Sequence, residues 1–151
     1  MASGNLAKKR TPFRPYHPTN LGDKAMPHLK LEHSTNIKEK IDPEALFSTC
    51  HQILVDTIGA DLFRCQSRVI PCNLFYIGDG SSKKGFIYLE VLLLEGRPLP
   101  KLQELGKALL KTLESYFATS LKELNLQMAV RLGEFSPSLY FKIETDPTIA
   151  R

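Results

Sequence analysis

The run Phe86-Ile-Tyr-Leu-Glu-Val-Leu-Leu-Leu94 contains one charged residue, Glu90, among nine positions. A continuous apolar run of this length is typical of a strand that is covered on both faces. Residues 78–85, Gly-Asp-Gly-Ser-Ser-Lys-Lys-Gly, precede the run and predict a turn. The sequence therefore predicts a buried strand near its centre, and the residues on either side alternate between further strands and helices.

The residues after this strand predict a helix and another strand. Residues 95–100, Glu-Gly-Arg-Pro-Leu-Pro, form a loop that leads into a helix of about eighteen residues. Its apolar stripe consists of Leu102, Leu105, Leu109, Leu113, Tyr116 and Phe117. Residues 124–132 then alternate apolar and polar side chains, as a strand does. Residues 138–143 are compatible with a short fifth strand.

The residues before the central run predict the same order. Residues 27–33 alternate as a half-buried strand. Asp42-Pro43-Glu44 then opens a helix, with an N-cap aspartate, a proline at the first helical position and a glutamate in the first turn. Gly59 is placed to end this helix. Residues 64–77 predict a second strand, in which Pro71 indicates a bend, a bulge or an edge position.

The resulting order, βαββαβ, predicts an α/β (α+β) fold. Each βαβ unit favours parallel pairing of its two strands through a right-handed crossover. Two such units give one four-stranded sheet with two helices on one face. The other face then lacks a covering layer, so we expect the protein to form an oligomer through it.

The basic character of the chain belongs to its first residues. The 151-residue sequence has a net charge of +4, yet residues 26–151 hold fifteen basic and fifteen acidic side chains. Residues 1–25 hold the other five basic residues and one acid, with three prolines and no apolar periodicity, so we expect a disordered leader. The balanced charge of residues 26–151 argues against a nucleic-acid partner for this domain. No apolar run is long enough for a membrane span, and the leader lacks the apolar stretch of a secretory signal.

The sequence contains few of the familiar signatures of catalysis. Its three cysteines, Cys50, Cys65 and Cys72, are odd in number and lack metal-binding spacing. We interpret them as reduced cytoplasmic thiols that pack as small hydrophobic residues. Zinc spacing, a P-loop, G-x-G-x-x-G and G-x-S-x-G are also absent from the sequence. No metal or other cofactor is predicted.

Several short segments share the order and spacing of one known family. They are Met-Pro-His at 26–28, Asn36-Ile37, Leu46-Phe47, Ser67-Arg68-Val69, Gly96-Arg97 and Ser-Pro-Ser-Leu-Tyr-Phe-Lys at 136–142. Through them, residues 26–151 resemble 5-carboxymethyl-2-hydroxymuconate isomerase. That family belongs to the tautomerase superfamily, with 4-oxalocrotonate tautomerase and macrophage migration inhibitory factor. The resemblance implies a homotrimeric, cofactor-independent enzyme of homoprotocatechuate breakdown.

The resemblance also implies which residue moves the proton. Members of the family begin with a proline whose secondary amine is the catalytic base, and the matching residue is Pro27. Converting a dienol to a conjugated ketone transfers a proton from oxygen to a distant carbon. An α-amine titrates near 8 when unperturbed, and burial or nearby cations lower its pKa towards neutral pH. His28 beside it is interpreted as a packed, hydrogen-bonded histidine.

The implied substrate carries two or three carboxylates, which guanidinium groups bind in bidentate fashion. Arg97 matches the family arginine in the loop after the third strand. A second family arginine is replaced by Gln66. If the strand is regular there, Arg64, Gln66 and Arg68 share one face, so either arginine could supply the charge. Alternatively, the substrate is less anionic.

The residues before Pro27 conflict with this chemistry, because a proline nitrogen in an amide bond has no basic lone pair. We expect translation to start at Met26, which would then be removed. Alternatively, residues 1–25 are an expression tag, or a genuine extension that is cleaved or marks the loss of the chemistry. Two other functions remain open: a tautomerase of another unsaturated keto acid, and a non-catalytic binding module with a blocked Pro27 and a basic leader.

Overall fold

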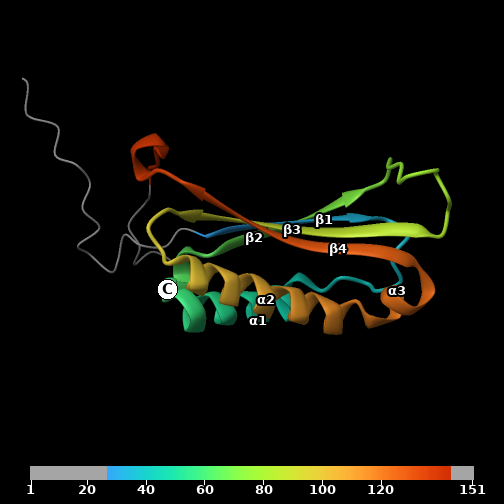
Figure 1. Ribbon diagram of the computed structural model, residues 1–151, viewed down its shortest axis with the longest axis horizontal. Coiled ribbons are helices and arrows are strands. Elements are labelled where there is room, and N and C mark those ends of the chain that lie inside the picture. The colour runs from blue at the N-terminus through green and yellow to red at the C-terminus, as the bar shows by residue number, and fades with distance from the viewer. Residues whose placement is uncertain (1–26, 144–151) are drawn as a thin grey trace, which may run out of the picture.

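A computed structural model describes residues 27–143, which form one four-stranded sheet with its helices on one side (Figure 1). The predicted leader, residues 1–25, lies outside the described residues. The strands are β1 (His28–Ser34), β2 (Gln66–Cys72), β3 (Lys84–Leu94) and β4 (Asn125–Phe135). Their spatial order is β2-β1-β3-β4. The predicted fold class is confirmed.

The two predicted βαβ units are present as parallel strand pairs. β1 pairs in parallel with β2, and β3 pairs in parallel with β4. The central strands β1 and β3 run antiparallel, with Lys30 opposite Glu90. This arrangement brings the start of β1 and the end of β3 to the same end of the sheet.

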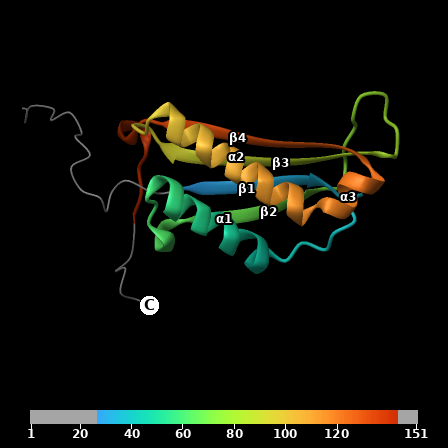
Figure 2. The same cartoon turned by 60° about the horizontal axis from the view of Figure 1, so that its bottom comes forward.

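The helices lie side by side across one face (Figure 2). Helix α1 (Pro43–Ile58) begins where predicted, since the side chain of Asp42 accepts a hydrogen bond from the Glu44 backbone N–H at 3.0 Å. It ends at Gly59, whose φ of 65° is in the left-handed region that favours glycine. Helix α2 (Leu99–Tyr116) has the predicted length and is followed by a short helix, α3 (Ala118–Glu123), that the sequence pattern did not indicate.

The hydrophobic core lies between the helices and the sheet. It is built from alternate residues of the central strands and from the apolar stripes of both long helices. Its fully buried large side chains are Leu29, Leu31, Leu46, Leu54, Ile87, Leu89, Val91, Leu93, Leu105, Leu109, Leu113 and Phe117. Cys50 is buried among them, and burial raises the pKa of its thiol to about 11. Cys65 and Cys72 are half-buried.

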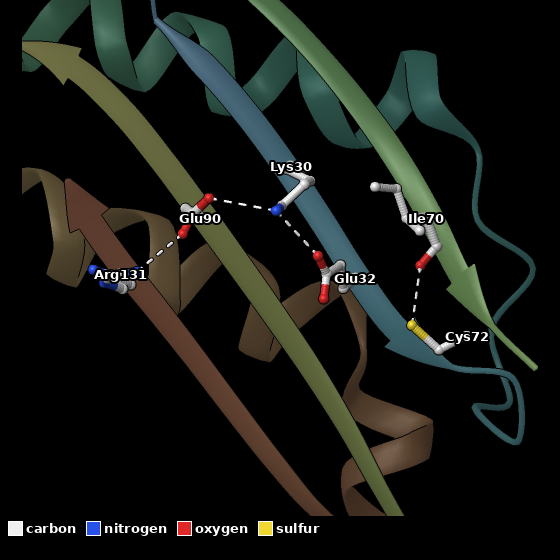
Figure 3. A network of polar contacts seen from close by, with 6 residues as sticks. All are labelled: Lys30, Glu32, Ile70, Cys72, Glu90 and Arg131. Carbon is white, nitrogen blue, oxygen red and sulfur yellow. Dashed lines mark hydrogen bonds and ion pairs between the residues drawn. The ribbon is translucent and has the colours of Figure 1, made fainter. Parts of the chain in front are cut away.

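The opposite face of the sheet, here called the open face, carries a ladder of charged side chains (Figure 3). Lys30 Nζ lies 3.2 Å from Glu32 Oε1 and 3.5 Å from Glu90 Oε1. Arg131 Nη1 lies 3.1 Å from Glu90 Oε2. The expectation that β3 is covered on both faces therefore holds on the helix side only, because no other element within residues 27–143 covers the open face.

Two of the predicted strands differ from the structure: one has other bounds, and the other is not a strand. β2 begins at Gln66 because residues 62–64 form a 3₁₀ turn, and it ends at Cys72, well before the predicted limit. The possible fifth strand at 138–143 is wrong. Residues 137–139 form another 3₁₀ turn instead, because Pro137 fixes its first position and Ser136 caps it. Within residues 27–143, no helix is long and apolar enough to span a membrane.

Candidate active site

Pro27 lies at one end of the sheet, directly before β1. It is buried, and its carbonyl oxygen accepts a hydrogen bond from the Gln66 backbone N–H at 3.0 Å. This bond continues the parallel register of β1 and β2 by one residue. The start of β1 is therefore fixed against the start of β2.

Arg97 lies at the same end, in the loop between β3 and α2. Gly96 precedes it with a φ of 115°, a conformation that suits glycine and turns the chain out of the strand. Arg97 Nη1 donates a hydrogen bond to the Leu94 carbonyl at 2.8 Å. Burial lowers the pKa of Arg97, and the charge of Glu134 opposes this shift. A guanidinium stays protonated in proteins, so this end of the sheet holds a half-buried cation.

The other three predicted residues do not lie on one face. Arg64 is in the 3₁₀ turn before β2 and is half-buried, with its Nε 3.5 Å from Asp61 Oδ2. Gln66 and Arg68 are exposed residues of β2 that share the open face. The predicted common face is therefore wrong for Arg64, because the regular strand starts only at Gln66.

Two further side chains at this end were missed as site residues. His28 Nε2 lies 3.3 Å from the Tyr140 hydroxyl, although the two residues are 112 positions apart in the sequence. The Tyr140 ring also packs on Phe135, with ring centroids 5.1 Å apart. Burial lowers the pKa of His28, and the charge of Arg68 lowers it further, which favours the neutral imidazole. No periodic pattern in the sequence indicates a contact across such a separation.

Pro27, Gln66, Arg97 and the His28–Tyr140 pair thus belong to one end of the sheet. Such an arrangement combines a position for an amine with cationic and neutral hydrogen-bond donors. It suits an anionic substrate that exchanges a proton. Within the described part of the chain, no group of three or more His, Cys, Asp or Glu side chains is placed to hold a metal ion.

The sequence pattern of the 5-carboxymethyl-2-hydroxymuconate isomerase family matches residues 27–145. The chain belongs to this family. It is 28% identical over 117 residues to the 5-carboxymethyl-2-hydroxymuconate Delta-isomerase of Escherichia coli. That match covers 78% of this chain and 93% of the relative. The family membership makes the chain an isomerase of the tautomerase type.

Solved structures agree with the assignment. A 5-carboxymethyl-2-hydroxymuconate isomerase from Deinococcus radiodurans R1 is similar with a TM-score of 0.75 and 26% identity, covering 83% of this chain and 95% of that one. A structure described as a fused 4-OT wild-type symmetric trimer has a TM-score of 0.54 and 15% identity, covering 74% and 87%. The second likeness shows that the isomerase shares the tautomerase fold.

Proposed function

We propose that this isomerase converts 5-carboxymethyl-2-hydroxymuconate, or a similar dienol carboxylate, into its conjugated ketone. The Pro27 amine would accept the proton of the enol oxygen and deliver it to the distant carbon, so the double bonds shift and no cofactor is consumed. The observation that carries the proposal is the position of Pro27. It is the first residue that the family pattern matches, and it lies at the same end of the sheet as Arg97.

Only a chain whose first residue is Pro27 can use this mechanism, because the amide nitrogen of an internal proline is not basic. We therefore include in the proposal that residues 1–26 are absent from the active form. Burial or nearby cations would lower the pKa of such an amine from its usual value near 8 towards neutral pH, where a general base works best.

The substrate carboxylates would be held by Arg97, with Arg64, Gln66 and Arg68 as further donors. Arg97 is half-buried, so water screens its charge less than that of an exposed arginine. Its charge would also draw electron density away from the carbon that receives the proton. Gln66 offers an amide donor without a charge, and this favours a substrate with fewer carboxylates as the alternative within the same reaction class.

We further propose that the isomerase is a homotrimer in the cytoplasmic breakdown of aromatic compounds. The uncovered open face supports assembly, because its charged ladder is flanked by apolar residues such as Ile70. A trimer is also named for the structural relative described above. The pathway and the compartment follow the family resemblance.

The test compares the full chain with a chain that starts at Met26 and is processed to Pro27, as verified by intact mass. Enol conversion is followed by ultraviolet absorbance. We expect activity only in the processed chain, and a loss of roughly 100-fold on Pro27→Ala, which replaces the rigid secondary amine by a freely rotating primary amine. Pro71→Ala, an exposed proline of β2, is the matched control. Equal activity of the full chain would overturn the role of Pro27. Salt-sensitive binding of a nucleic acid or an acidic partner by an inactive chain would favour the binding-module alternative.

A further inference from the structure

The segment that follows β4 returns to the residue next to Pro27. After Phe135 the chain turns through the 3₁₀ residues 137–139 and places Tyr140 beside β1. Its hydroxyl lies 3.3 Å from His28 Nε2, and the two rings are 6.2 Å apart at 55°. Both side chains are half-buried. A side-chain contact therefore connects the end of the fold to the start of β1.

The same segment also holds the loop that carries Arg97. The Glu95 backbone N–H donates a hydrogen bond to the Phe135 carbonyl at 3.0 Å. The Phe135 ring in turn packs on Tyr140, with an interplanar angle of 41°. Phe135 and Tyr140 together connect the Arg97 loop with the residue that follows Pro27.

We propose that Tyr140 is a positioning residue of the isomerase, which acts through His28 to hold the Pro27 amine in register with the Arg97 guanidinium. The inference rests on the proposed function of these two groups. Proton transfer depends steeply on such alignment, and a displacement of about 1 Å can cost up to 10²-fold in rate. Tyr140 itself need not touch the substrate to have this effect.

The hydroxyl and the ring of Tyr140 have separable roles. The ring packs on Phe135 and faces the His28 ring, whereas the hydroxyl makes the polar contact with His28 Nε2. Tyr140→Phe therefore removes this hydrogen bond and retains the packing of the rings. Substrate binding by Arg97 should be little affected, because Arg97 is anchored separately on the Leu94 carbonyl.

The test measures kcat and KM for the chain that begins at Pro27, which contains every described strand and helix. We expect Tyr140→Phe to lower kcat roughly 10-fold, within the range that misalignment produces, and to leave KM within about 2-fold. His28→Leu should have a similar effect. The double variant should be no slower than the slower single variant, because both remove the same contact. Tyr76→Phe, an exposed tyrosine in the loop before β3, is the matched control.

Three results would overturn the inference. They are an unchanged kcat in Tyr140→Phe, a purely additive double variant, or a loss in Tyr140→Phe that appears in KM alone. These results require an active parent chain, so they are distinct from failure of the proposed function. If the parent chain itself does not turn over dienol substrates, the proposed function fails and the inference is overturned with it.

Discussion

The backbone N–H of Gln66 donates to the carbonyl oxygen of Pro27 at 3.0 Å, so the two residues are held side by side at the end of the sheet. This bond fixes the start of β2 against the residue that we propose as the base. The Gln66 side chain extends from that fixed point and is exposed on the open face. A change at Gln66 therefore alters the donors near Pro27 without disturbing the core.

Gln66→Arg should increase activity towards tricarboxylate substrates. A guanidinium at this position would replace a neutral amide donor by a charged, bidentate one. We expect kcat/KM for a tricarboxylate dienol to rise roughly 10-fold relative to a dicarboxylate, the effect of one charge-assisted hydrogen bond. Gln127→Arg, an exposed residue of β4 near the opposite end of the sheet, is the control. If kcat/KM changed by the same factor for both substrates, a role of residue 66 in discriminating tricarboxylates from dicarboxylates would be refuted.

Glu39 should stabilise the fold in its ionised form. Burial alone would raise the pKa of Glu39, but hydrogen bonds from the hydroxyl and the N–H of Ser120 outweigh it and hold the pKa below its ordinary value of 4.5. The stabilisation is therefore complete above pH 4.5 and is lost as the pH falls through the lowered pKa. Glu39→Gln should lower the free energy of unfolding by about 1 kcal/mol at pH 7 and by less at pH 3, as measured in urea.

The control for this measurement is Glu114→Gln, an exposed residue of α2. It should change stability little at either pH. An equal loss for Glu39→Gln at pH 7 and pH 3 would contradict the role of the charge.

Arg68→Gln should raise the pKa of His28. Burial lowers this pKa first and the charge of Arg68 lowers it further, so removing the charge should restore part of the shift towards 6.5. The unfolded chain binds the His28 proton more readily than the folded chain, so the free energy of unfolding falls as the pH drops below 6.5. The Arg68→Gln variant should lose less of this free energy than the parent chain. Titration of the imidazole by NMR measures the pKa directly. Arg131→Gln on β4 should leave it unchanged.

Glu90→Gln should weaken an assembly that forms through the open face. Glu90 pairs with both Lys30 and Arg131, so without it an interface that covers this face would bury Arg131 without this carboxylate and leave Lys30 with Glu32 alone. We expect the dissociation constant of the assembly to rise roughly 100-fold, as measured by analytical ultracentrifugation. Glu104→Gln, which breaks an exposed pair with Lys101 in α2, should change it less than about 5-fold. Equal effects would indicate that the open face stays in water.

The sequence predicted the elements better than the contacts between them. Asp42 and Gly59 marked the limits of α1 because caps are local interactions. The turn before β2 was missed, since Asp61 caps it through its side chain and its apolar residues Leu62 and Phe63 also suit a strand. The family resemblance predicted that Arg97 and Pro27 belong to one site. In the structure they lie at the same end of the sheet because β1 and β3 pair antiparallel. Tyr140 was not predicted as a site residue, because its contact with His28 depends on the path of the chain after β4.

The placement of β1 between β2 and β3 has a consequence for the order of folding. The first βαβ unit can pair β1 with β2, but the other edge of β1 has no partner until β3 is available. The buried leucines of β1 and β3 come from different halves of the chain and pack in one core. Neither half can bury its apolar surface alone, so we expect a nascent chain to stay unfolded until β3 has left the ribosome, and the whole domain to fold cooperatively.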